Sequence, residues 1–113
     1  MHLNPTGIDH VNLQVINLEA TCAFYRELFG FETFEEIPEQ NGRIIGNQRV
    51  KLAVYETPGM QPYEKVGFAH FSLHLENFDQ VETKCTEMGI KIQYDGVLDW
   101  AKSRSYYIND PNG

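Results

Sequence analysis

The segment IDHVNLQV, residues 8–15, alternates between polar and apolar positions in the manner of a β-strand. After Ile8, one face of such a strand carries three polar side chains: His10, Asn12 and Gln14. After Asp9, the other face carries three apolar side chains: Val11, Leu13 and Val15. An alternating strand usually has one solvated face. The polar row therefore either meets solvent or lines a cavity.

The same pattern recurs in the second half of the chain. GIDHVNLQVINLE near the N-terminus reappears as GFAHFSLHLENFD at a constant offset, which matches His10 with His70 and Asn17 with Asn77. Solenoids need at least three repeats, so two copies of this length favour a duplicated half-domain. A polar row at equivalent positions of both copies favours a shared cavity over two solvated faces.

Each copy predicts a strand, a helix and further strands. Asn17 and Asn77 are preferred helix N-caps, and Gly30 and Gly89 can take the left-handed conformation that ends a helix. Between these caps, apolar residues follow the helical period: Leu18, Cys22, Tyr25 and Phe29, then Phe78, Val81, Cys85 and Met88. The strands expected next cover residues 31–37, 43–46 and 50–56 in the first copy, and 91–94 and 103–109 in the second.

The pattern predicts one α+β domain over residues 1–113, with module one at about 7–60 and module two at about 67–113. The first module reads βαβββ and the second βαββ. The counterpart of strand 50–56 would begin where only residues 110–113 remain, so the last strand of module two is missing from the chain. We expect either a longer protein whose next strand carries a glutamate, or a second copy that covers the open edge.

Composition narrows the choice of partner. A net charge of −7 argues against nucleic acid, because phosphate binding requires a basic surface. No run approaches the roughly 20 apolar residues of a membrane span, and the N-terminus lacks the pattern of a secretory signal. The two cysteines suit free thiols in a reducing compartment. We therefore expect a cytoplasmic protein with a small-molecule ligand.

Three stretches carry a family resemblance: GIDHVNLQVINLEATCAFYRELFGFE, HFSLHLENFDQVETKCTEMGI and SRSYYINDPNG. In these the chain resembles the vicinal oxygen chelate superfamily, which includes glyoxalase I, extradiol dioxygenases, methylmalonyl-CoA epimerase, fosfomycin-resistance proteins and bleomycin-binding proteins. The resemblance implies paired βαβββ modules that form a U-shaped mixed sheet around a cavity. It also implies frequent assembly as a homodimer.

The resemblance further implies a divalent metal ion held by His10 and His70. The family's carboxylate ligand comes from the last strand of module two, beyond Gly113. Some members use another glutamate, which Glu56 matches unless a gap moves the match to Leu52 or Ala53. Zn, Ni, Mn and Fe are not distinguished by such ligands.

Two further side chains are candidates for catalysis. His74 lies on the polar face of the second copy, where it could shuttle protons or hold a hydrogen bond in a structural role. Glu56 could be a ligand, a general base or only the polar end of a strand that enters the TPG turn.

Four side chains are expected to contact the substrate: Asn12, Trp100, Arg104 and Tyr106. Trp100 stands in the polar context LDWAKSR, as an exposed cavity wall would, and Arg104 could hold a carboxylate or phosphate through two hydrogen bonds. Core packing is the alternative for the aromatic residues. Surface solvation is the alternative for Arg104.

These features leave two functions open. The histidine pair favours a metal-dependent enzyme acting on a small oxygenated substrate by isomerase, lyase, dioxygenase or epoxide-opening chemistry, with the metal as Lewis acid. The negative charge, the missing carboxylate and the clustered aromatic residues favour a metal-free protein that sequesters a drug or metabolite, as bleomycin-binding relatives do. Metal content would separate the two.

Overall fold

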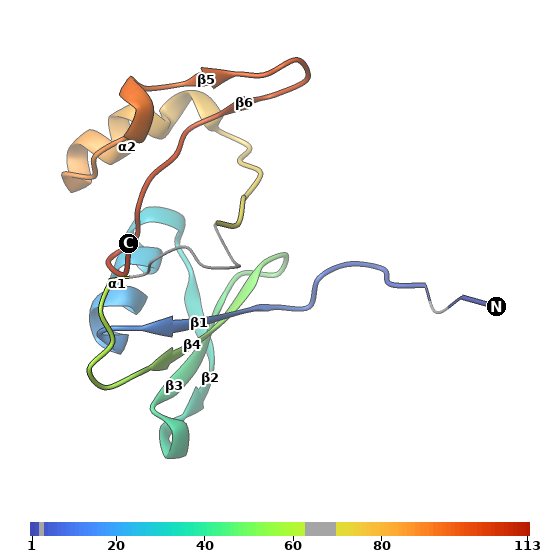
Figure 1. Cartoon of the computed structure of the whole chain (residues 1–113), viewed down its shortest axis with the longest axis vertical. Helices are drawn as coiled ribbons and strands as arrows, with labels where there is room; N and C mark the ends of the chain where they lie inside the picture. Colours follow the sequence, from blue (N-terminus) through green and yellow to red (C-terminus); the bar gives the residue numbers. More distant parts are fainter. Residues whose placement is uncertain (3, 63–69) are drawn as a thin grey trace. The chain divides into compact units, whose positions relative to one another are not determined.

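The computed structural model describes residues 1–2, 4–62 and 70–113 (Figure 1). The chain divides into two compact units, Met1–Gln61 and Pro62–Gly113, each of which is described by itself. The equivalence of Gly67 with Gly7 lies outside the described residues. In the part of the chain that is described, no helix has the length and apolar character needed to cross a bilayer.

The first unit is a βαβββ module, as the sequence predicts. Its elements are β1 (Val11–Val15), α1 (Leu18–Phe29), β2 (Glu32–Ile37), the 3₁₀ turn η1 (Pro38–Gln40), β3 (Gly42–Gly46) and β4 (Lys51–Glu56). They form a mixed sheet in the order β1-β4-β3-β2. The β1–β4 pair is parallel, whereas β4–β3 and β3–β2 are antiparallel. The α+β class is therefore confirmed.

Both predicted ends of α1 are confirmed. The Asn17 side chain accepts a hydrogen bond from the Ala20 N–H at 2.8 Å, which satisfies one of the free donors of the first turn. Gly30 has φ of 71° and donates its N–H to the Arg26 carbonyl at 2.8 Å, which ends the helix in the left-handed conformation. The helix buries a stripe with the expected spacing: Leu18, Thr21, Cys22 and Tyr25.

One face of the four-stranded sheet points toward α1. Two contacts identify it: Glu56 on β4 bonds the N–H of Leu18, and Arg43 on β3 bonds Glu19. Side chains alternate along a strand, so the positions in register with these two point the same way. They form the buried core of the unit: Val15, Ile45, Leu52 and Val54.

The opposite face of the sheet carries the intervening positions. The register sets Asn12 beside Ala53 and Gln14 beside Tyr55, and it sets Ile44 beside Ala53 from the other side. Asn12 and Gln14 are exposed, whereas Ala53 is buried. We call these five residues the amide face.

The second unit contains less regular structure. Its elements are the 3₁₀ turns η2 (Phe78–Gln80) and η3 (Gln93–Asp95), the helix α2 (Val81–Met88), and the short strands β5 (Leu98–Asp99) and β6 (Arg104–Ser105). Gly89 ends α2 with φ of 69°, as expected. The predicted capping by Asn77 is wrong, because its side chain makes no cap hydrogen bond and a 3₁₀ turn precedes the helix.

Two predicted strands at the heads of the modules need correction. The first begins at Val11, so His10 lies just before β1 and not within it. Residues 70–75 form no strand, although Phe71 and Leu73 are more buried than their neighbours, as alternation expects. A strand needs a hydrogen-bonded neighbour, and in the first unit the neighbour of β1 is β4. By the repeat offset, the equivalent of β4 in the second unit would begin at Asp110–Gly113, where the chain forms a turn.

The predicted strands 91–94 and 103–109 are also shorter in the structure. They are reduced to an isolated antiparallel bridge between Ile92 and Ile108 and to the two-residue strand β6. Tyr94 has φ of 56°, a conformation that a strand cannot contain, and it turns the chain at η3.

Candidate functional site

His10 lies next to a carboxylate that can orient its ring. Its Nδ1 is 2.9 Å from Oδ2 of Asp9, and the His10 side chain is 48% exposed. This hydrogen bond, followed by the charge of His10, lowers the pKa of Asp9. A histidine that bonds a carboxylate through one ring nitrogen presents the other nitrogen for a metal or a proton. The sequence prediction singled out His10 but not Asp9, although their adjacency was visible.

Asn12 belongs to a row of hydrogen-bonded polar side chains. Oγ1 of Thr57 donates to Oε1 of Gln14 at 2.6 Å, and Nε2 of Gln14 donates to Oδ1 of Asn12 at 3.0 Å. Thr57 is held beside the end of β1 because its N–H donates to the Val15 carbonyl at 2.9 Å. In this arrangement Gln14 accepts from Thr57 and donates to Asn12, so the donations run toward Asn12.

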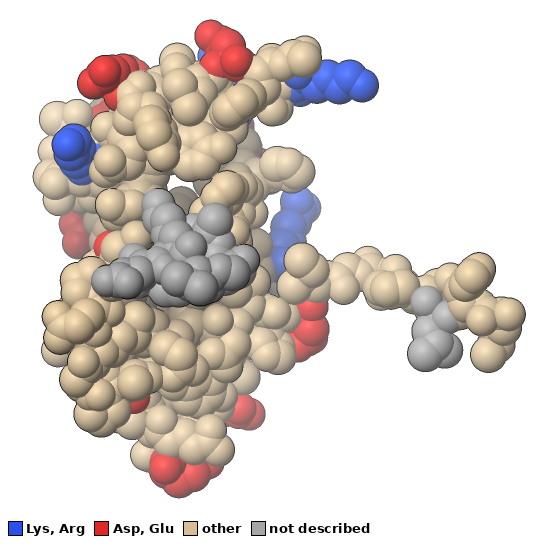
Figure 2. Space-filling view, viewed as in Figure 1, with Lys and Arg blue, Asp and Glu red and all other residues tan. Residues whose placement is uncertain are grey.

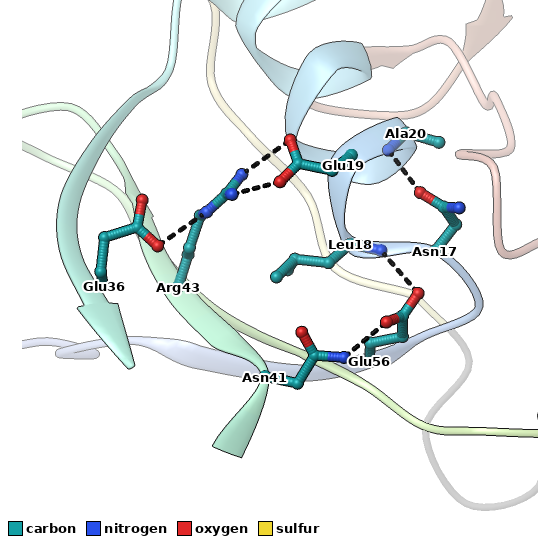
Figure 3. A network of polar contacts seen from close by, with 8 residues as sticks. All are labelled: Asn17, Leu18, Glu19, Ala20, Glu36, Asn41, Arg43 and Glu56. Atoms are coloured by element: carbon teal, nitrogen blue, oxygen red, sulfur yellow. Dashed lines mark hydrogen bonds and ion pairs between the residues drawn. The ribbon is translucent and has the colours of Figure 1, made fainter. Parts of the chain in front are cut away.

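Glu56 connects three elements of the first unit (Figure 3). Its Oε1 accepts the Leu18 N–H at 3.4 Å, and its Oε2 accepts from Nδ2 of Asn41 at 2.5 Å. The carboxylate thus lies at the positive N-terminal end of α1, where a negative charge is stabilising. Both carboxylate oxygens have protein partners, which favours the structural interpretation of Glu56 over the ligand or general base.

Arg43 forms a second polar cluster in Figure 3. Its guanidinium bonds the Glu19 carboxylate through two nitrogens, and its Nε lies 3.0 Å from Oε2 of Glu36. The hydrogen bonds to these two carboxylates, Glu19 first and Glu36 second, raise the pKa of Arg43, whose side chain is 18% exposed. Arg43 therefore joins α1, β2 and β3.

In the second unit, His70 is the end of a chain of aromatic contacts. Its ring meets the Tyr107 ring edge-on, with centroids 5.6 Å apart and an angle of 89°. Tyr107 meets Tyr94 in the same way, at 5.5 Å and 90°. His74 is exposed, as an alternating position should be. The contact of His70 with Tyr107 could not be predicted from alternation, because the two residues are far apart in sequence.

The structure brings two of the predicted substrate residues together on Phe78. The Arg104 guanidinium lies 4.9 Å from the Phe78 ring centroid, and the Tyr106 ring lies 5.0 Å from it. Burial, followed by a hydrogen bond to Glu82, raises the pKa of Tyr106. Trp100 lies elsewhere, at the turn of the β5–β6 hairpin, and is 52% exposed.

The residues suit a divalent metal ion in part. The imidazoles of His10 and His70 are exposed, and the Asp9 partner of His10 is typical of metal-binding histidines. Glu56 does not suit the role, because its oxygens are bonded elsewhere. Within the described ranges, no group of three or more His, Cys, Asp or Glu side chains is placed to hold an ion.

Charged side chains are spread over the surface that Figure 2 shows. On that face the lysine and arginine atoms occur in separate places, interrupted by uncharged atoms. The absence of a nucleic acid partner stays a prediction from the net charge of −7.

Residues 7–113 match the Glyoxalase/Bleomycin resistance protein/Dioxygenase superfamily. The chain belongs to this superfamily, as the sequence resemblance predicts, and the match covers both modules.

Two curated relatives are similar in sequence. A trivalent organoarsenical cleaving enzyme from Bacillus sp. (strain MD1) is 30% identical over 92% of this chain and 66% of its own length. A catechol-2,3-dioxygenase from Bacillus subtilis (strain 168) is 29% identical over 96% of this chain and 39% of its own length. The chain thus spans just under two thirds of one relative and about two fifths of the other.

Solved structures share the fold. A lactoylglutathione lyase from Agrobacterium tumefaciens is 24% identical with a TM-score of 0.68, and the match covers 96% of this chain and 89% of that one. A fosfomycin resistance protein, FosX, from Listeria monocytogenes is 17% identical with a TM-score of 0.76, over 96% of this chain and 86% of that one. A mutant of FosX was crystallised with Mn(II) and 1S,2S-dihydroxypropylphosphonic acid.

Proposed function

We propose that this chain belongs to a divalent-metal-dependent enzyme that acts on a small oxygenated substrate. The observation that carries the proposal is the Asp9–His10 hydrogen bond, which directs one imidazole nitrogen to a carboxylate and leaves the other for a ligand. Membership of a superfamily in which FosX binds Mn(II) supports it. The curated relatives are named as an organoarsenical-cleaving enzyme and a dioxygenase, which supports an enzyme with lyase or oxygenase chemistry.

In this proposal His10 and His70 each supply one imidazole nitrogen to the ion. A bound divalent ion supplies Lewis-acid polarisation of a substrate oxygen. Asp9 keeps the His10 ring in one tautomer, and Tyr107 restricts the ring of His70 by its edge-on contact. The third ligand is not assigned to any described residue. His74 is retained as a proton shuttle, because its ring is exposed and free to meet solvent or substrate.

The proposed substrate contacts differ in their surroundings. Asn12 is exposed on the amide face, where it can bond a substrate oxygen. Trp100 is exposed and can form an aromatic wall. Arg104 and Tyr106 pack on Phe78, so in this proposal they contact the substrate through the outer edge of this cluster of three side chains.

We also propose that the protein is a cytoplasmic homodimer. Equilibrium sedimentation would test the homodimer, and cell fractionation would test the location.

The decisive experiment measures metal binding. Protein purified without chelators is freed of metal, titrated with Zn(II) and Mn(II) by calorimetry, and checked by elemental analysis. We expect the His10→Ala and His70→Ala variants to lose binding while their circular dichroism spectra stay unchanged. His2→Ala is the matched control, because His2 is an exposed histidine outside both modules. Unchanged stoichiometry in His10→Ala would overturn the proposal.

A second function is favoured by a different observation. Tyr94 and Trp100 are exposed by 66% and 52%, and exposed aromatic side chains are suited to stack on a planar ligand. We propose, as the alternative, a metal-free protein that sequesters a drug or metabolite. Tryptophan fluorescence quenched by an aromatic ligand in the presence of a chelator would support this alternative. Loss of binding on chelation would reject it.

A further inference from the structure

The amide face of the first unit contains a directed set of hydrogen bonds that the proposed metal chemistry does not use. Thr57 donates to Gln14 at 2.6 Å, and Gln14 donates to Asn12 at 3.0 Å. A side-chain amide has one carbonyl and one NH2 group. Because the Asn12 carbonyl accepts from Gln14, its NH2 group is turned away from the row and is presented at the exposed end.

Asn12 is exposed, and its neighbours across the sheet have small or apolar side chains. Its neighbour on β4 is Ala53, the smallest side chain in that strand, and the next neighbour on β3 is Ile44. The Tyr55 ring lies directly over Gly42, where any side chain would collide with it. The amide face thus combines one oriented, exposed donor with small or apolar neighbours.

The geometry points to Gln14 and Thr57 as positioning residues that hold the Asn12 NH2 group outward to bind an acceptor oxygen of the ligand. This inference rests on the proposed contact between Asn12 and the substrate. It adds which chemical groups of a substrate that contact selects. A ligand that offers a carbonyl, carboxylate or phosphate oxygen is bound at this position. A ligand that offers only N–H donors is rejected, because two donors would then face each other.

The effect of each partner can be separated by substitution. Thr57→Val removes the hydroxyl that fixes Gln14, while Thr57→Ser keeps it. Gln14→Glu replaces the amide by a carboxylate, which accepts hydrogen bonds but cannot donate one to Asn12. The Asn12 amide then turns its NH2 group toward Glu and presents its carbonyl outward, so the preference for an acceptor ligand is reversed.

The test follows the side-chain NH2 signals of Asn12 by NMR, assigned by their loss in Asn12→Asp. Two probes are titrated: inorganic phosphate as a charged acceptor and N,N-dimethylacetamide, which has no N–H group, as a neutral one. We expect a saturable shift with one or both probes in the unmodified protein and in Thr57→Ser. Binding should weaken about fivefold in Thr57→Val, as the loss of one net hydrogen bond implies, and no saturable shift should remain in Gln14→Glu.

Controls distinguish this inference from the proposed function. The NH2 signals of Asn47 in the same spectra report nonspecific probe binding, and unchanged backbone spectra show that each variant is folded. Zn(II) binding measured on the same samples tests the metal proposal separately. If the metal binds through His10 but Asn12 gives no saturable shift, or if Gln14→Glu binds the probes as the unmodified protein does, this inference is overturned while the metal proposal stands.

Discussion

The carboxylate of Glu56, the last residue of β4, accepts a hydrogen bond from the backbone N–H of Leu18, the first residue of α1. The second carboxylate oxygen is bonded to Asn41, next to the tip of the β2–β3 hairpin. One side chain therefore joins the end of the sheet, the start of the helix and a hairpin. Its position at the helix N-terminus adds a favourable interaction with the helix dipole.

We predict that Glu56→Ala lowers the stability of the protein by about 1 kcal/mol, because the first turn of α1 loses an acceptor for an exposed N–H group. Glu56→Gln keeps an acceptor oxygen and should lose less than half of that amount. Urea denaturation followed by circular dichroism measures both. Metal binding should be the same in both variants as in the unmodified protein. Loss of the metal in Glu56→Gln without a change in stability would instead identify Glu56 as a ligand.

The first module could be predicted from the sequence because its local signals agree with its long-range contacts. Asn17 and Gly30 mark α1 through their own backbone and side-chain preferences, and both were confirmed. Alternation located β1, since its apolar face meets the buried side chains of β4. The role of Arg43 could not be predicted, because its partners Glu19 and Glu36 come from elements brought together only by folding.

In the second module, the same local signals did not suffice. Residues 70–75 alternate as well as β1 does, but a strand also needs a hydrogen-bonded neighbour, and the counterpart of β4 is not among the described residues. Asn77 has the same capping preference as Asn17, yet the chain enters α2 through a 3₁₀ turn. Propensity is overridden where tertiary pairing differs between two similar sequences.

Arg43 gives a prediction about pH. Its hydrogen bond and charge lower the pKa of Glu19 below the ordinary value of 4.5. A carboxyl group with a lowered pKa in the folded state stabilises the protein above the pKa of the unfolded chain, and this contribution is lost as the pH falls through the folded-state pKa. Stability should therefore fall on acidification below about pH 4.5. The fall should be shallower in Arg43→Met, measured by thermal unfolding across that range.

The matched control for this prediction is Arg49→Met, because Arg49 is an exposed arginine in the β3–β4 turn with no ion pair among those described. Its pH profile should run parallel to that of the unmodified protein. Identical slopes for Arg43→Met and the unmodified protein would show that the Arg43–Glu19 contact does not contribute in solution.

The two cysteines should be unreactive in the folded protein. Cys22 and Cys85 are free thiols that are 4% and 2% exposed, and burial raises the pKa of each. The thiolate is the reactive form, so both burial and the raised pKa slow alkylation. We expect iodoacetamide at neutral pH to leave both unmodified in the native protein and to modify both in urea, as intact mass measures. Rapid modification of Cys85 in the native state would show that α2 opens locally.

Gly42 tests the packing of the amide face. A Cβ atom built on Gly42 would lie 2.4 Å from the Tyr55 ring and 3.0 Å from the Val54 carbonyl oxygen, so Gly42→Ala forces the ring to move. We predict a loss of about 1–3 kcal/mol for this substitution, which is the usual cost of overpacking. Removing the ring by Tyr55→Ala relieves the contact, so the double variant should be more stable than the sum of the single effects implies. Urea denaturation of the four proteins in this cycle measures the coupling. Strict additivity would mean that the Tyr55 ring does not cover Gly42 in solution.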